Sequence, residues 1–216
     1  MKSIKKVDFL FEAKSMGLSA ILPIISLLFL VFFNYSEQGP EITRKLSIFI
    51  EFVICPLAAW WCIYLFIDYY EDNMEEVLFT YPVSIFFHGI LRTLIFLFSF
   101  IAFFLICLIP LSYRQEEFLY SMQVLQYIPQ CILYGSLGFC LMIISRNIVI
   151  PLLCIVGYVA GKYFTGGSKL FPVYNVMYFD IGDSYQLVLG KALLNIAFAF
   201  LFFLIGHLIL SKRTHI

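Results

Sequence analysis

Six apolar blocks, separated by short polar segments, run along the whole sequence. Each block is close to the roughly 20 residues that cross a hydrocarbon layer about 30 Å thick. The blocks cover residues 16–34, 46–67, 83–111, 121–145, 148–164 and 188–210. This pattern predicts an all-α, polytopic integral membrane protein with six transmembrane helices.

Three segments outside these blocks are more than polar turns. Residues 1–15 mix four lysines with apolar side chains, which predicts an amphipathic elbow helix at the headgroup level. Residues 68–82 are acidic at first and apolar at the end. The link 165–187 contains the apolar run FPVYNVMYF, so we expect it to dip into the edge of the bilayer.

Composition agrees with a membrane-embedded chain. Of the 216 residues, 62% are hydrophobic and 13% are charged, whereas soluble domains are about 25% charged. Six spans use about 120 residues, so we expect one transmembrane domain over residues 1–216, without a nucleotide-binding domain. The 14 basic and 14 acidic residues balance, which gives no indication of nucleic-acid binding.

No metal site is expected. The six cysteines lie in apolar stretches without CxxC spacing, which is typical of small packing residues. His88 and His207 are single histidines in apolar runs, with no second ligand three or four residues away.

The distribution of lysine and arginine predicts the orientation. With six spans, eight basic residues lie on the side of the two chain ends and six on the other side. Because basic residues concentrate in cytoplasmic flanks, we expect a multi-pass protein of the cell membrane with both termini cytoplasmic. The segment 68–82 is then cytoplasmic and the link 165–187 faces outside.

The acidic segment is the most informative feature of the chain. In a helix, side chains three or four positions apart share a face, so Glu71 and Leu78 would lie on one face and Glu75 and Phe79 on another. A short amphipathic helix beside the membrane suits docking on a partner. The alternative is a solvated loop whose acids keep it out of the bilayer.

The run EDNMEEVLFTYPVS at 71–84, followed by Arg92, resembles the intracellular coupling segment of ABC-2 type transporter permeases. An elbow, six spans and an apolar link between the last two spans also agree with that family. The resemblance implies a permease subunit of an ATP-driven exporter, with a cytoplasmic coupling helix and a re-entrant outer segment. The residues that it assigns to ATPase coupling are Glu71, Asp72, Glu75, Glu76, Leu78, Phe79 and Pro82.

The same resemblance implies partners and cargo. Separate cytoplasmic ABC ATPase subunits would bind ATP and Mg²⁺, while this chain would bind no cofactor. The permease would work as a homodimer, or as a heterodimer with a similar permease. Amphipathic peptides, lipid-linked material or drug-like molecules are typical cargo of such exporters.

Two other classes of protein stay open. One is a stand-alone membrane immunity or sensor protein, in which residues 68–82 are only a loop; the other is a motif-poor intramembrane enzyme. An enzyme is not expected, because neither H-E-x-x-H nor G-x-S-x-G occurs. The run GYVAGKY at 157–163 is no phosphate loop, since it has one residue too few between its glycines and Tyr where Ser or Thr is needed.

Polar residues inside the predicted spans are the remaining candidates. A stripe on one face of the fourth span either lines a substrate path or makes interhelical hydrogen bonds. Glu51, in the second span, is either a functional acid or an acid that snorkels to the interface or pairs with Arg44. The Gly157 and Gly161 pair predicts close helix packing. The stripe consists of Gln123, Gln126, Tyr127, Gln130 and Tyr134.

Overall fold

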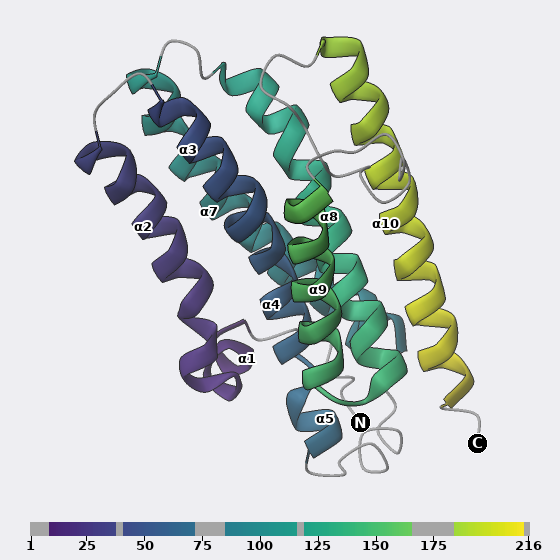
Figure 1. Cartoon of the computed structure of the whole chain (residues 1–216). Helices are drawn as coiled ribbons and strands as arrows, with labels where there is room; N and C mark the ends of the chain where they lie inside the picture. Colours follow the sequence, from purple (N-terminus) through teal and green to yellow (C-terminus); the bar gives the residue numbers. More distant parts are fainter. Residues whose placement is uncertain (1–8, 38–40, 72–84, 116–118, 166–183, 214–216) are drawn as a thin grey trace.

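The computed structural model describes residues 9–37, 41–71, 85–115, 119–165 and 184–213 (Figure 1). Helices account for 93% of these residues, and no strand occurs among them. The helices are α1 (Phe9–Ser15), α2 (Leu22–Ser36), α3 (Ile42–Phe49), α4 (Cys55–Tyr64), α5 (Ile67–Glu71), α7 (Arg92–Arg114), α8 (Tyr120–Ser145), α9 (Val149–Thr165) and α10 (Tyr185–Arg213). A 3₁₀ turn, η1 (Gly17–Ala20), and two π-helical turns, η2 (Ile50–Ile54) and η3 (Phe87–Leu91), complete them.

Five helical segments are long and apolar enough to cross a membrane. They are Gly17–Ser36, Ile42–Tyr64, Phe87–Arg114, Tyr120–Ser145 and Tyr185–Lys212. The segment expected as the fifth span is α9, an apolar helix of 17 residues. The all-helical class with several membrane-spanning candidates is confirmed, while the sixth crossing, by α9, stays a prediction.

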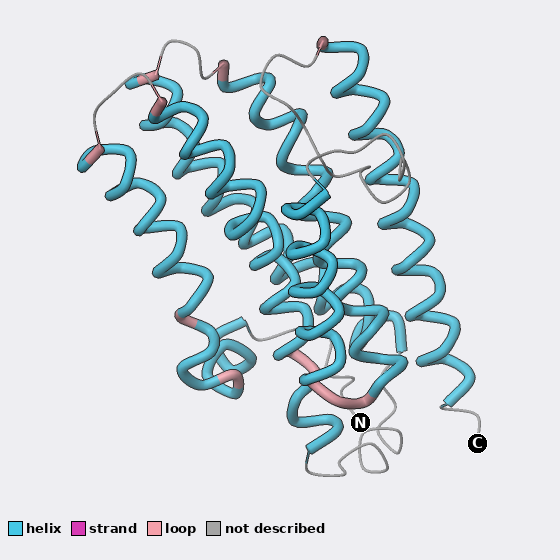
Figure 2. The backbone as a smooth tube through the Cα atoms, in the orientation of Figure 1, coloured by secondary structure: helices cyan, strands magenta, loops and turns pink. Residues whose placement is uncertain are grey.

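The helices form one bundle whose two ends carry different connections. Figure 1 places α1, α5, the turn between α8 and α9, and the last turn of α10 at one end, called here the α1 end. The last turn of α2, the first turn of α3, the last turn of α7 and the first turn of α8 lie at the opposite end, called the far end. Figure 2 shows that non-helical backbone in the described part is confined to these ends. This arrangement agrees with an even number of crossings; which end faces the cytoplasm stays a prediction.

Helix α8 is the centre of the bundle and packs against α4, α7, α9 and α10. Small residues bring its neighbours close. A Cβ atom added at Gly138 would lie 2.9 Å from the Ala59 Cβ of α4, and one at Gly135 would lie 2.7 Å from Leu97 of α7. On α10, a Cβ at Gly206 would lie 2.6 Å from the Phe139 ring. These glycines permit helix contacts that larger side chains would prevent.

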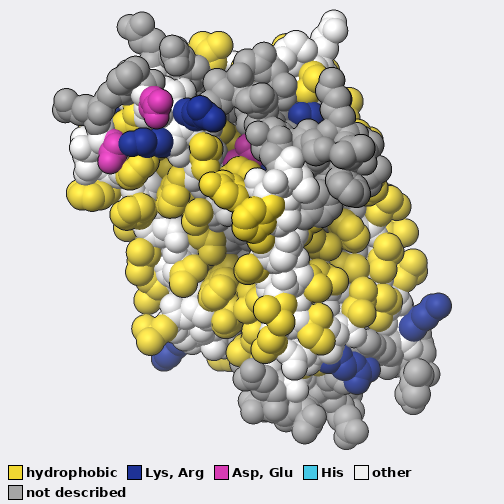
Figure 3. Space-filling view, viewed as in Figure 1, with side chains coloured by type: hydrophobic (Ala, Val, Ile, Leu, Met, Phe, Trp, Pro, Cys, Tyr) yellow, Lys and Arg dark blue, Asp and Glu magenta, His cyan; other side chains and the backbone are white. Residues whose placement is uncertain are grey.

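The outer surface of the bundle is apolar between its two ends. Figure 3 shows hydrophobic side chains over the flank of the molecule and charged ones near its ends. Leu153 is 65% exposed and Phe200 is 68% exposed. In water such a surface would be unfavourable, whereas hydrocarbon is its natural surrounding.

Two tryptophans of α4 bind the backbone where the first span is interrupted. Residue 23 is proline, so it has no N–H to donate to the carbonyl of Ser19 four residues before it. The Trp60 indole Nε1–H donates to the Ser19 carbonyl at 2.9 Å, and Trp61 Nε1–H donates to the Ala20 carbonyl at 2.9 Å. Both carbonyls belong to η1. The tryptophans therefore supply hydrogen-bond donors to the two carbonyls at the interruption, and they fix α4 to the first span.

We expect Trp60→Phe to destabilise the bundle. The phenyl ring keeps the position stacked on Tyr64 but removes the N–H, which leaves the Ser19 carbonyl without its donor. The free energy of unfolding should fall by about 1–3 kcal/mol, the usual cost of an unsatisfied buried polar group. Denaturant titration in mixed micelles measures it.

Pro23→Ala is the matched second change, because alanine gives residue 23 an N–H again. In the Trp60→Phe background it should recover part of the lost stability. Equal unfolding free energies for wild type and Trp60→Phe would show that the indole bond does not support the break.

Candidate functional site

A π-helical turn places Glu51 inside the bundle. Pro56 has no N–H for the carbonyl of Phe52, and its ring crowds that carbonyl in a regular α-helix. The helix widens over Ile50–Ile54, where the Cys55 N–H donates to the carbonyl of Ile50, five residues earlier. Such a turn adds one residue and changes which side chains face inward. Glu51 is buried there, with 4% of its surface exposed.

Lys162 of α9 is the partner of Glu51. Its ammonium Nζ lies 2.7 Å from Glu51 Oε1, and the two side chains are 0% and 5% exposed. The same ammonium donates to Gln130 Oε1 at 3.4 Å and lies 5.0 Å from the centre of the Phe52 ring. An acid, an amide oxygen and an aromatic face thus surround one buried cation, as a charge inside a membrane bundle requires.

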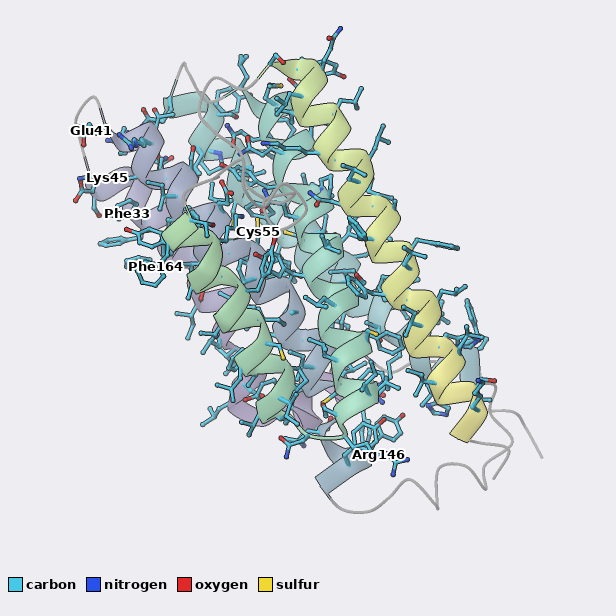
Figure 4. The ribbon with its side chains drawn as sticks, turned by 45° about the vertical axis from the view of Figure 1, so that its right-hand side comes forward. Phe33, Glu41, Lys45, Cys55, Arg146 and Phe164 are labelled. Atoms are coloured by element: carbon cyan, nitrogen blue, oxygen red, sulfur yellow. The ribbon has the colours of Figure 1, made fainter. Side chains whose placement is uncertain are left out.

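The prediction that Glu51 pairs with Arg44 is wrong. Both residues lie on the α3–η2 segment at a spacing of two turns, but Arg44 is exposed near the far end. Lys162 enters from another helix at the depth of Glu51, where water does not compete for the carboxylate. Figure 4 illustrates the contrast along this segment: Glu41 and Lys45 lie at the edge of the bundle, and Cys55 lies within it.

The polar stripe of α8 faces the interior of the protein. Gln123, Tyr127, Gln130 and Tyr134 are all buried, and Gln126 is half-buried. Gln130 Nε2–H also donates to the Gln126 carbonyl at 3.3 Å. The stripe, Glu51 and Lys162 therefore form one buried polar site. Whether cargo passes along it is a proposal taken up below.

A second cluster, part buried and part half-buried, lies at the α1 end. Arg92, at the start of α7, forms an ion pair with Glu12 of α1. Its guanidinium carbon lies 4.9 Å from the centre of the Tyr69 ring and 5.8 Å from that of Phe66. The Tyr69 hydroxyl and His88 Nδ1 are hydrogen-bonded at 3.1 Å. These five residues, the Arg92 cluster, join α1, α5, η3 and α7.

The residues assigned to ATPase coupling are not placed by the structure. Asp72, Glu75, Glu76, Leu78, Phe79 and Pro82 lie outside the described residues. Glu71 ends α5, and nothing is described of its side chain. Most of the link 165–187 also lies outside the described ranges.

Close packing at Gly157 does not occur within the described part of this chain. A Cβ atom added there would meet nothing within 4 Å, because the glycine lies on an exposed face of α9. Gly161, one turn later, is half-buried. The spacing of two glycines fixes their common face but not the direction in which that face points.

Sequence reasoning missed Lys162 as a site residue. The available signal was its position: it is a lysine in an apolar helix, and Glu51 is an acid in an apolar span. Intramembrane charges pair with one another, which would have suggested this contact. Among the described residues, no group of three His, Cys, Asp or Glu side chains is placed to hold a metal ion.

We expect Glu51→Gln to destabilise the protein strongly. It leaves Lys162 as a buried cation without a carboxylate, and breaking one side of a buried pair costs about 3–5 kcal/mol. Adding Lys162→Met should restore most of the stability, because the unpaired charge is then removed. Unfolding in mixed micelles measures both variants.

Lys45→Met is the matched control, since it breaks the Lys45–Glu37 pair, whose side chains are 51% and 42% exposed. That loss should be at most about 1 kcal/mol. Equal losses for Glu51→Gln and Lys45→Met would contradict the assignment of Glu51–Lys162 as a buried pair.

Comparisons with known proteins give no relative for this chain. No protein-family model, no curated protein and no solved structure matches it. A proposal of function therefore depends on the buried polar site around Glu51, the Arg92 cluster and the sequence pattern.

Proposed function

We propose that this chain is the transmembrane permease subunit of an ATP-driven ABC-2 type transporter, exporting an amphipathic peptide, lipid-linked or drug-like cargo. The observation that supports this proposal is the Arg92 cluster. It lies at the α1 end, where the acidic segment leaves α5 and where the chain returns at η3. ATP and Mg²⁺ would be bound by separate ATPase subunits.

The Arg92 cluster joins the two flanks of the acidic segment. Tyr69 lies at the start of the segment, in α5, and His88 follows the segment in η3, so the hydrogen bond between their side chains ties its two ends together. Arg92 lies on the Tyr69 ring and pairs with Glu12, which adds α1 to the same unit. A push on residues 72–84 would therefore move α5, α7 and α1 together. A force-transmitting connection between an ATPase and a membrane bundle needs this mechanical unity.

Docking itself would use the segment's own side chains. Phe79 and Leu78 are suited to anchor in an apolar groove of the ATPase, while Glu75 and Glu76 set the register by charge. ATP binding would shift the bundle between inward-facing and outward-facing states. The buried polar site around Glu51 lies in the far-end half, where cargo would pass. A second permease copy, or a similar permease, would complete the transporter.

The first test is association and coupling. We expect the chain purified from its native membranes to carry an ABC ATPase and to stimulate its hydrolysis. Glu75→Ala combined with Phe79→Ala should abolish the stimulation without loss of helicity or thermal stability. Normal coupling by this double variant, or absence of any ATPase partner, would overturn the proposal.

Variants of residues that the structure describes test the same stimulation of ATP hydrolysis. Tyr69→Phe keeps the ring under Arg92 but removes the hydroxyl that binds His88, so stimulation should fall while the ATPase stays bound. Tyr113→Phe makes the same chemical change at a residue that is 87% exposed at the other end of α7, and it should have no effect.

Orientation is tested by labelling. A cysteine introduced as Asn73→Cys should react with a membrane-impermeant thiol reagent only from the cytoplasmic side. Glu41→Cys, at the far end of the bundle, should react only from outside. The reverse pattern would overturn the topology, and labelling of both positions from one side would exclude an odd number of crossings between them.

A further inference from the structure

Two rows of polar side chains face each other in the far-end half of the bundle. Ser47, Glu51 and Cys55 follow at four-residue spacing along α3, η2 and the start of α4. Gln123, Tyr127 and Tyr134 lie on the inner face of α8. We call these six residues the polar seam.

Contacts across the seam show that the two rows meet. The Cys55 thiol lies 3.9 Å from the Tyr127 carbonyl oxygen, and Ser47 is the polar side chain next to the Tyr127 hydroxyl. Lys162 connects the rows from the side, because it pairs with Glu51 and donates to Gln130 of α8. Cys55, Tyr127 and Lys162 therefore link the two rows in the middle of the seam.

Several atoms of the seam are buried yet without a hydrogen-bond partner among the residues that the structure describes. They are Gln123 Oε1 and the hydroxyls of Tyr127 and Tyr134. Tyr127 and Tyr134 are 0% exposed, so bulk solvent does not reach them directly. Ser47 lies beside Tyr127, but no hydrogen bond of normal geometry joins the two hydroxyls.

Asn195 of α10 adds to this pattern. It is 0% exposed, and both ends of its amide are unpartnered within the described ranges. Lys191 lies one turn before it on the same face and is near enough to act electrostatically on Lys162. Asn195 thus adds two buried, unpartnered polar atoms on α10, the helix that packs against α8.

We propose that the polar seam binds a chain of internal water molecules, which begins at Gln123 and ends at Tyr134. Buried polar groups in native proteins find partners, and ordered water is the usual partner where protein atoms do not supply one. The unpartnered groups are neutral and include donors as well as acceptors, and water can serve both. The charges of Glu51 and Lys162 already neutralise each other, so an additional ion is not required.

The two ends of the seam differ. Gln123 lies near the far end in the first turns of α8 and is 9% exposed, the most of the α8 residues in the seam. Beyond Tyr134, Gly135 and Gly138 bring Leu97 and Ala59 into close contact with α8. Phe139 then packs against Phe66 and Phe203, with ring centres 5.5 and 5.7 Å away. Water entering from the far end would therefore stop at an apolar floor.

Hydration of the seam does not require an ATPase partner. It shares Glu51, Gln123, Tyr127 and Tyr134 with the proposed cargo path and would keep that path hydrated in this conformation. A dry seam would leave ATPase coupling untouched, and a missing ATPase would leave hydration untouched, so the two proposals can fail separately.

X-ray radiolytic footprinting of the full chain in lipid nanodiscs tests the proposal. Hydroxyl radicals generated from bound water oxidise side chains beside it, and mass spectrometry gives the rate at each residue. Cys55 and Cys131, which lie next to each other at the seam, are compared with Cys62, and all three are 0% exposed. Tyr127 and Tyr134 are compared with Phe96 and Phe100, which are both 1% exposed in the apolar core.

We expect the seam residues to be oxidised severalfold faster than their matched controls. Tyr127→Phe should slow oxidation of Cys55 and Tyr134, because it removes one water-binding hydroxyl, while Tyr113→Phe should leave both rates unchanged. Equal rates at Cys55, Cys131 and Cys62 in the wild-type protein would show a dry seam and overturn the proposal. Uniform oxidation of seam and core would overturn it as well.

Discussion

A charge inside a membrane bundle has to find its partner inside the protein, and the Glu51–Lys162 pair meets this requirement here. The pair does more than neutralise two charges. Lys162 belongs to α9, the short apolar helix whose outer face is exposed, and Glu51 belongs to the segment between α3 and α4. Their contact, extended by Gln130, ties α9 to the centre of the bundle. The position of α9, and with it the polar interior of the far-end half, depends on this interaction.

A second ion pair neutralises a buried charge at the α1 end. Arg92 of α7 and Glu12 of α1 are joined there, and aromatic rings of Phe66 and Tyr69 cover the guanidinium. In both pairs one member is associated with a π-helical turn: Glu51 lies within η2, and Arg92 directly follows η3. An inserted residue rotates the following side chains, and such turns are frequent at functional sites. One pair organises the polar interior, and the other fixes the flanks of the acidic segment.

The helical fold was largely readable from the sequence, because hydropathy reports which segments can leave water. The inward direction of the α8 stripe was also readable, since Gln130 and Tyr134 would be unfavourable in lipid. The π turn at Ile50–Ile54 was not, because one inserted residue leaves the apolar pattern unchanged while it alters the face that each side chain presents. Spacing along one helix offered Arg44 as one alternative for Glu51, but its partner is 111 positions further along the chain, on α9. Such spacing contains no information on a contact between helices, and only the presence of a second charge in an apolar helix could have suggested it.

The Glu51–Lys162 contact can be observed directly by magic-angle-spinning NMR on the protein in lipid bilayers. With ¹⁵N at lysine Nζ and arginine Nη, and ¹³C at glutamate Cδ, a through-space signal should connect Lys162 and Glu51, as their 2.7 Å nitrogen–oxygen distance requires. The signal should vanish in Lys162→Met, which assigns it. Absence of the signal in the wild-type protein, or a correlation of Glu51 with the Arg44 guanidinium instead, would contradict this account of the bundle.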